Sequence, residues 1–232
     1  MTNSEFVFPA SFAQQRLWFL CQLAPNNPFY NVSAAVRLNG NLDLKALEQT
    51  FNEIVRRHEV LRTTFEMIDG QLHQVVAEQA TLTLNFIDLR YHAANDRNNE
   101  VRRQAIALSQ LPFDLAGDFL LRITVFQLNA TEHILLLNLH HIIADGWSIG
   151  VLIREISTLY TAFSAGKSSP LPDLPIQYAD FAYWQREYLQ GEVLESQLAY
   201  WRSQLADMPT LNLPSDRPGP AIPSYKGATQ PL

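Results

Sequence analysis

From residue 133 to residue 140 the chain reads His-Ile-Leu-Leu-Leu-Asn-Leu-His, which is the most apolar strand pattern in the sequence. Residues 134–139 are apolar on both faces, which is typical of a central strand covered on both sides of a sheet. The pair His140-His141 ends the run, and Ile-Ile-Ala-Asp-Gly follows at residues 142–146. Titratable side chains therefore stand where a buried strand opens into a loop, a common place for the sites of α/β proteins.

The two histidines should face opposite sides of the sheet, because side chains alternate along a strand. Only one of them can then enter a given cleft, so His140 and His141 do not act as a unit. These residues alone also fit two hydrogen-bonded core histidines followed by an ordinary Asp-Gly turn. A metal site is disfavoured, because adjacent strand histidines diverge and the nearby sequence offers no second histidine or cysteine cluster.

The sequence on either side of this strand predicts helices mixed with paired strands. Periodicity and capping residues indicate helices over 11–20, 44–58, 97–110 and 149–163, and strands over 31–38, 61–68, 72–77, 81–87, 121–128 and 133–140. A Ser/Pro-rich connector at 167–175 then leads to an aromatic helical stretch over 177–206. Asp69-Gly70 predicts a hairpin, and Ser148 is the expected cap of the helix that follows the histidines. This order of elements predicts an α/β (α+β) two-layer sandwich with a mixed sheet.

Composition narrows the class of protein. The chain has 232 residues, of which 47% are hydrophobic, and a formal charge of −6. This length suits one large domain or two small ones, and the apolar content excludes disorder for most of it. Without a basic stretch, nucleic acid and anionic membranes are unexpected partners. No signal peptide or membrane span is evident, and the single cysteine, Cys21, fits a core position in a cytoplasmic protein.

Residues near the strand exit suggest direct transfer with a histidine base rather than covalent catalysis. His141, facing a cleft, can take a proton from a nucleophile or hold that nucleophile in line. Asp145 lies past the strand end, where Arg62 is the obvious cation to pair with it. Gly146 allows close backbone approach, and its N–H, at a helix start, suits developing negative charge. The sequence shows no nucleophile elbow and no Gly-rich phosphate loop, so a histidine base fits best.

Four segments of the sequence resemble the motifs of a known family. Residues 140–148 resemble the HHxxxDG motif of non-ribosomal peptide synthetase condensation domains. Residues 11–20 resemble the family's opening motif, residues 57–65 its second motif, RHExLRTxF, and residues 178–185 its fourth, all in the right order. HHxxxDG alone is shared with a wider superfamily that includes chloramphenicol acetyltransferase, whereas four ordered motifs together are highly specific.

The resemblance implies a chloramphenicol-acetyltransferase-like lobe with a mixed β-sheet and flanking helices. An acceptor α-amine would attack a donor acyl thioester to form an amide. Both substrates would arrive on peptidyl carrier proteins, whose phosphopantetheine arms are the partners' cofactor, so this chain would bind none directly. By motif, His141 would be the functional histidine, as base or as positioner of the amine, and Gly146 would line the site. His140, Asp145 and Arg62 would be structural, with Asp145 paired to Arg62.

Subtype and extent follow from the same resemblance. Heterocyclisation domains replace the paired histidines with aspartates, and epimerisation domains typically carry Ser-Trp after the aspartate, where this chain has Gly146-Trp147. The opening motif looks most like that of domains taking an L-configured donor. Condensation domains have two lobes, and the match covers only the first. We therefore expect an N-terminal lobe over 1–208 and a proline-rich crossover over 209–232, toward a C-terminal lobe and neighbouring synthetase domains outside this chain.

Three functions remain open at this level. The first is the catalytic half of an amide-forming condensation domain, incomplete or weakly active alone. The second is a free-standing HHxxxDG acyltransferase that rebuilds its cleft by oligomerising. The third is a non-catalytic module that docks carrier proteins. The intact His141, Asp145 and Arg62 argue against pure docking. Tyr178 and Trp184, in the fourth motif, favour the synthetase branch.

Overall fold

The structure is a computed structural model that describes residues 5–117, 119–211 and 214. The chain divides into two compact units between Glu187 and Tyr188. The expected boundary after residue 208 stays a prediction, because residues 212–213 and 215–232 of the proline-rich segment lie outside the described residues.

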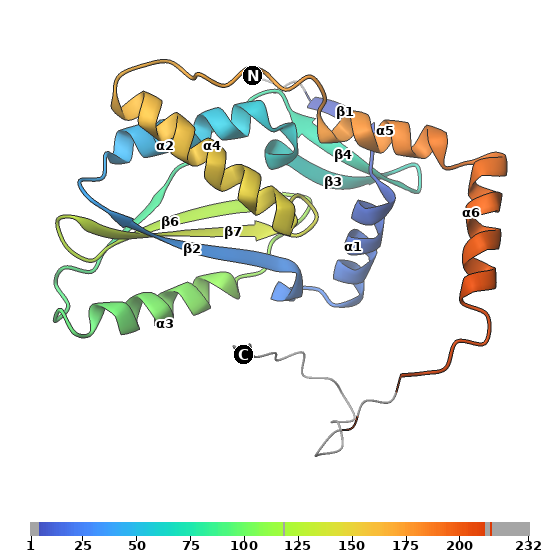
Figure 1. Ribbon diagram of the computed structural model, residues 1–232, viewed down its shortest axis with the longest axis horizontal. Coiled ribbons are helices and arrows are strands. Elements are labelled where there is room, and N and C mark those ends of the chain that lie inside the picture. Colours follow the sequence, from blue (N-terminus) through green and yellow to red (C-terminus); the bar gives the residue numbers. More distant parts are fainter. Residues whose placement is uncertain (1–4, 118, 212–213, 215–232) are drawn as a thin grey trace. The chain divides into compact units, whose positions relative to one another are not determined.

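The first unit contains nearly all of the regular structure (Figure 1). Its elements are β1 (Glu5–Pro9), α1 (Phe12–Leu23), η1 (Pro28–Tyr30), β2 (Asn31–Asn39), α2 (Leu44–Arg57), η2 (Glu59–Arg62), β3 (Thr63–Ile68), β4 (Gln71–Ala77), β5 (Asn85–Asp88), α3 (Arg97–Ser109), β6 (Leu121–Gln127), β7 (Glu132–His140), α4 (Gly146–Ser164) and all but the last residue of α5 (Tyr178–Tyr188). The predicted helices and strands are thus present, with shifted ends. Strand β1 was not predicted, since it is short and ends at a proline.

The main sheet has the strand order β2-β7-β6-β5, with β7 between two antiparallel neighbours. Strand β5 runs parallel to β6, so the sheet is mixed, as predicted. Every residue of β7 from His133 to His140 is buried. The prediction of a central strand covered on both sides is confirmed.

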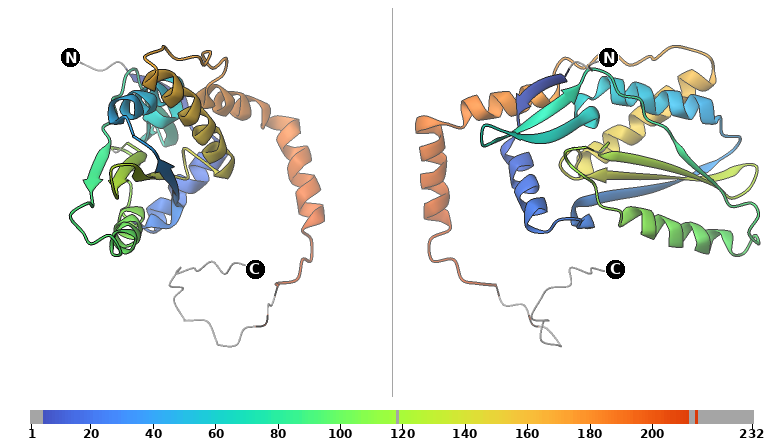
Figure 2. Two further views of the ribbon diagram at one scale, coloured as in Figure 1. Left: turned by 60° about the vertical axis from the view of Figure 1, so that its left-hand side comes forward. Right: turned by 180° about the vertical axis from the view of Figure 1, so that it is seen from behind.

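Alternate residues of β7 belong to two separate cores. Leu135, Leu137 and Leu139 join the larger cluster, to which α2 and α4 contribute. Ile134 and Leu136 join a smaller cluster with residues of α3. Helices therefore flank both faces of the main sheet, and α3 adds a layer beyond the expected two (Figure 2).

A second, three-stranded sheet has the order β1-β4-β3. Strands β3 and β4 form the predicted hairpin, and Asp69 and Gly70 take φ values of 50° and 77° at its turn. Positive φ at both turn residues matches the right-handed twist of the strands and explains the Asp-Gly pair.

The second unit, described by itself, contains α6 (Gly191–Gln204), none of whose residues is buried. The aromatic stretch expected to be helical over 177–206 is therefore broken, with Gly191 at φ 53° opening the second helix. Across the described part of the chain, no helix is both long and apolar enough to span a membrane.

Replacing Phe51 in α2 tests the larger core, because its side chain is fully buried. We expect Phe51→Ala to lower the free energy of unfolding by about 3–5 kcal/mol, the cost of lost burial plus a cavity. Phe19→Ala on α1, where the side chain is 56% exposed, is the matched control, with an expected cost below about 1 kcal/mol. Equal losses in urea-induced unfolding would contradict this picture of the core.

Candidate active site

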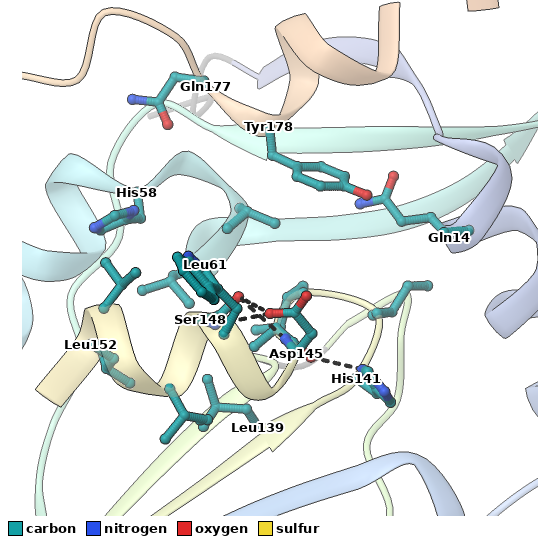
Figure 3. A pocket seen from close by; sticks show the side chains of 18 of the residues that line it. Gln14, His58, Leu61, Leu139, His141, Asp145, Ser148, Leu152, Gln177 and Tyr178 are labelled. Carbon is teal, nitrogen blue, oxygen red and sulfur yellow. Dashed lines mark hydrogen bonds between the residues drawn. The ribbon is translucent and has the colours of Figure 1, made fainter. Parts of the chain in front are cut away.

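A pocket of about 570 Å³ lies at the exit of β7 (Figure 3). Its walls come from α1, η2, the loop between β7 and α4, the first turns of α4, and residues 174–178. The four sequence motifs therefore meet around one cavity. It is lined by, among others, Gln14, His58, Leu61, Leu139, His141, Asp145, Ser148, Leu152, Gln177 and Tyr178.

His141 follows β7 directly, and its side chain lines the pocket. The His141 backbone N–H donates to the carbonyl oxygen of Tyr30 at 2.7 Å. Its ring Nδ1 lies 2.8 Å from the carbonyl oxygen of Ala144. A carbonyl oxygen only accepts, so Nδ1 carries the hydrogen and Nε2 of the neutral ring keeps its lone pair. Within the described residues, no group bonds to Nε2, which is thus available to a ligand.

His140 lies on the opposite face of the strand and is 2% exposed. Its Nδ1 accepts the Ile142 N–H at 3.1 Å, and its Nε2 lies 3.6 Å from Cys21 Sγ. Burial, with a smaller contribution from His141, lowers the pKa of His140 to about 4. His140 is therefore a neutral core residue, and the prediction that the two histidines diverge is confirmed. The half-buried Cys21 has a pKa raised by burial.

Asp145 caps the N-terminus of α4 rather than binding a distant cation. Its Oδ1 accepts the Ser148 N–H at 2.8 Å and the Ser148 hydroxyl at 2.7 Å, while its own N–H donates to Ser148 Oγ at 3.3 Å. These bonds lower the pKa of Asp145. The helix thus begins at Gly146, and the expected cap at Ser148 is wrong, because Ser148 is the third helical residue of a capping box.

The expected pair between Arg62 and Asp145 is wrong. Arg62 donates to the carbonyl oxygens of Ala77 at 2.7 Å, Val55 at 2.9 Å and Arg56 at 2.7 Å, and its Nη2 lies 3.2 Å from Glu59 Oε1. The last carbonyls of a helix lack intrahelical partners. Arg62 supplies donors to those at the end of α2, so its role is structural but outside the pocket lining.

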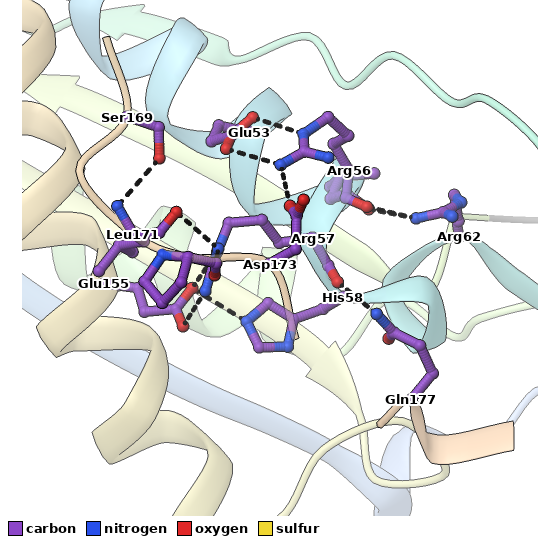
Figure 4. Close-up of polar contacts among 12 residues, drawn as sticks. Glu53, Arg56, Arg57, His58, Arg62, Glu155, Ser169, Leu171, Asp173 and Gln177 are labelled. Carbon is purple, nitrogen blue, oxygen red and sulfur yellow. Dashed lines mark hydrogen bonds and ion pairs between the residues drawn. The ribbon is translucent and has the colours of Figure 1, made fainter. Parts of the chain in front are cut away.

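A buried ion pair that the sequence did not reveal joins α2 to α4 (Figure 4). Arg57, 4% exposed, holds Glu155 through two contacts, Nη2 to Oε1 at 3.2 Å and Nε to Oε2 at 3.3 Å. His58 Nε2 lies 2.9 Å from Glu155 Oε2. Burial opposes ionisation of Glu155, but the hydrogen bonds from Arg57 and His58 outweigh it and hold the pKa of Glu155 low. In the sequence, Glu155 is visible only as a charged residue next to the apolar stripe of α4.

The segment before α5 is fastened to the end of α2 by polar contacts. Arg57 Nη1 donates to the carbonyl oxygens of Leu171 and Pro172, and Arg56 pairs with Asp173 at 2.9 Å. Gln177 Nε2 donates to the Arg57 carbonyl at 2.8 Å. These contacts hold residues 171–177 in place as one wall of the pocket.

The opening and fourth motifs also contact one another. The hydroxyls of Ser11 and Tyr178 are 3.0 Å apart, and Ser11 caps α1 by accepting the Gln14 N–H at 3.2 Å. Gln14 in turn donates to Gln74 Oε1 at 3.0 Å. Tyr178 therefore ties the start of α5 to the pocket wall formed by α1. Within the described ranges, no three histidine, cysteine or acidic residues converge as metal ligands.

Comparison with known proteins assigns the family. The model of the condensation domain family matches residues 4–232. A linear gramicidin synthase of Brevibacillus parabrevis is 50% identical over 222 residues, which are 95% of this chain and 3% of that protein. Chondramide synthase cmdD of Chondromyces crocatus is 45% identical over 221 residues, 95% of this chain and 6% of that protein. The chain belongs to the condensation domain family and spans a small part of these relatives.

Solved structures agree on the fold. The X-domain in the complex of X-domain and OxyB from teicoplanin biosynthesis aligns with a TM-score of 0.81 at 32% identity, over 94% of this chain and 47% of that chain. The starter condensation domain of rhizomide synthetase RzmA aligns with a TM-score of 0.79 at 20% identity, over 88% of this chain and 49% of that chain. The predicted α/β class, with its mixed sheet and flanking helices, is confirmed.

Burial of neutral His140 should make stability depend on pH. Its pKa is about 4 in the folded chain and about 6.5 when unfolded. The unfolded chain then binds more protons between these values, so the free energy of unfolding falls as pH drops from about 7 to 4, by about 3 kcal/mol from this residue. His140→Asn keeps an acceptor for the Ile142 N–H but does not titrate. Parallel urea-derived pH profiles for the chain and this variant would contradict the assignment.

The absence of an Arg62–Asp145 pair is tested by a double-mutant cycle. We expect Asp145→Ala to cost about 1 kcal/mol through the lost helix cap, and Arg62→Ala about 2 kcal/mol through its lost bonds to carbonyls. Their coupling energy in urea unfolding should stay below about 0.5 kcal/mol, because the sites share no partner. A coupling energy of several kcal/mol would show that Arg62 and Asp145 do form an ion pair.

Proposed function

We propose that this chain forms the histidine-bearing side of an amide-forming site in non-ribosomal peptide synthesis, where an acceptor α-amine attacks a donor acyl thioester. The observation that carries the proposal is the fixed tautomer of His141. Its Nδ1 hydrogen is bound to the Ala144 carbonyl, and its Nε2 lone pair is left for a ligand of the pocket. Membership of the condensation domain family supports the reaction class.

The proposed chemistry uses one proton acceptor. The amine nitrogen bonds to the thioester carbonyl carbon, and the excess proton of that nitrogen passes to His141 Nε2. The tetrahedral intermediate then expels the thiolate as its C–S bond breaks, and the imidazolium returns the proton to sulfur. A free α-amine has a pKa of about 8, so the same lone pair serves equally to hold the amine in line. Both roles require the tautomer described here.

Gly146 is the proposed backbone contribution to the site. It is the first residue of α4, where helix N–H groups carry partial positive charge. Among the described residues, none accepts a hydrogen bond from the N–H of Gly146 or Trp147. A Cβ at Gly146 would meet nothing within 4 Å, so packing within this chain does not demand glycine here. We assign the open space to substrate and the N–H groups to the oxyanion.

The proposed substrates are acyl groups carried on phosphopantetheine by donor and acceptor carrier proteins. The pocket is lined largely by apolar side chains, among them Leu61, Ile143 and Leu152. Trp147, 81% exposed, lines the same pocket. Such a cavity suits an apolar acyl side chain and a pantetheine arm rather than a charged ligand. The phosphopantetheine stays bound to the carrier proteins throughout.

A docking role without chemistry is the second candidate. The observation that favours it is the likeness to the teicoplanin X-domain, which was solved as a complex with OxyB. A docking module would bind loaded carrier proteins and form no amide. The experiment on His141 below separates the two functions.

We expect His141→Ala to lower the rate of amide formation by about 10²-fold or more, because general-base or positioning assistance is lost. The assay supplies two aminoacyl-loaded carrier proteins and the remaining half of a condensation domain as a separate chain. His92→Ala, in the connection before α3, is the control and should keep full activity. Equal rates for the chain and His141→Ala would overturn the proposal, and carrier binding without product would favour docking.

A further inference from the structure

The second histidine of the pocket, His58, is oriented as strictly as His141. Glu155 is held ionised by its two contacts with Arg57, and an ionised carboxylate only accepts hydrogen bonds. His58 Nε2, 2.9 Å from Glu155 Oε2, must therefore carry the hydrogen. In the neutral ring the lone pair is then on Nδ1.

The remaining nitrogen of His58 is open. The side chain lines the pocket and keeps 23% of its surface exposed. No hydrogen bond to Nδ1 is present in the part of the chain that the structure describes, and Nδ1 is not among its buried polar atoms without a partner. Nδ1 of the neutral ring is therefore a solvent-accessible acceptor, and the Glu155 contact prevents the ring from turning freely.

We propose that His58 is a substrate-binding residue whose Nδ1 accepts a hydrogen bond from an N–H group of the aminoacyl or peptidyl thioester, with Glu155 as the residue that positions it. The proposal rests on the proposed function for the class of substrate. Arg57 balances the charge of Glu155, and the lone pair of a neutral His58 ring is suited to a neutral amide N–H. In this proposal His141 accepts a proton from the reacting nitrogen or positions it, whereas His58 orients the acyl chain.

Two substitutions separate this role from a purely structural one. His58→Gln places an amide nitrogen near the position of Nε2, so it can still donate to Glu155, but it lacks an acceptor at the position of Nδ1. His58→Asn places an amide oxygen near the position of Nδ1, so it keeps the acceptor but loses the Glu155 contact. A residue that matters only as the partner of Glu155 would tolerate glutamine better than asparagine.

The probes are N-acetyl-leucyl-pantetheine and its derivative methylated on the leucyl nitrogen, with binding to the chain measured by calorimetry. We expect the methylated probe to bind the unaltered chain about tenfold more weakly, the value of one hydrogen bond. His58→Gln should bind the unmethylated probe about tenfold more weakly and no longer discriminate between the two. His58→Asn should retain most of the discrimination. The ¹⁵N resonance of His58 Nδ1 should shift with the unmethylated probe only.

Unchanged discrimination in His58→Gln, greater loss in His58→Asn than in His58→Gln, or no measurable binding of either probe would overturn the proposal. Urea unfolding confirms that each variant is folded. These measurements involve no amide formation, so they stand apart from the His141 assay. Suppose that His141→Ala is fully active in the amide-forming assay while the unaltered chain still binds the unmethylated probe more tightly. The proposed chemistry would then be wrong, but the role of His58 in binding would stand.

Discussion

Burial of β7 on both faces sets the positions of the elements packed around it. A strand with apolar neighbours above and below has a fixed register, because a slip of one residue would exchange its two faces. Leu139 belongs to the larger core, so His141, two residues on, emerges on the side of α2 and α4. His140 is left on the other side, 2% exposed. The position of the His141 imidazole is thus a consequence of core packing several residues earlier.

Backbone hydrogen-bond partners then determine the tautomer of each imidazole. The Ala144 carbonyl fixes the hydrogen of His141 on Nδ1, whereas the Ile142 N–H requires a lone pair on Nδ1 of His140. Adjacent residues of one type are therefore held as opposite tautomers by backbone groups of the same short loop. The capping box at Asp145 fixes where that loop ends and α4 begins. Ordinary satisfaction of backbone polar groups accounts for most of the site's geometry.

Local pattern predicted β7, the divergent histidines, the Asp-Gly hairpin and the position of α2, because each depends on periodicity or turn chemistry within a few residues. It failed where partners are distant in the chain. Charge and the family resemblance both pointed to a pair between Arg62 and Asp145, but the backbone carbonyls at the end of α2 were equally in need of donors. The pairing of Arg57 and His58 with Glu155, far along the chain, has no signal in local periodicity. The edge strand β1 was missed because pairing with β4, rather than its own sequence, makes it a strand.

The wall formed by residues 171–177 is held differently from the rest of the pocket. Polar contacts at its ends and to Arg56 and Arg57 keep it in place, while Leu174 and Ile176 contribute side chains to the cavity without belonging to the buried core. Changes at these two positions alter the cavity at little cost to folding, whereas changes at Leu139 or Ile143 disturb the core directly. Substitutions in this connecting segment can therefore change the shape of the pocket while the strand β7, the histidine that follows it and the helix α4 stay unchanged.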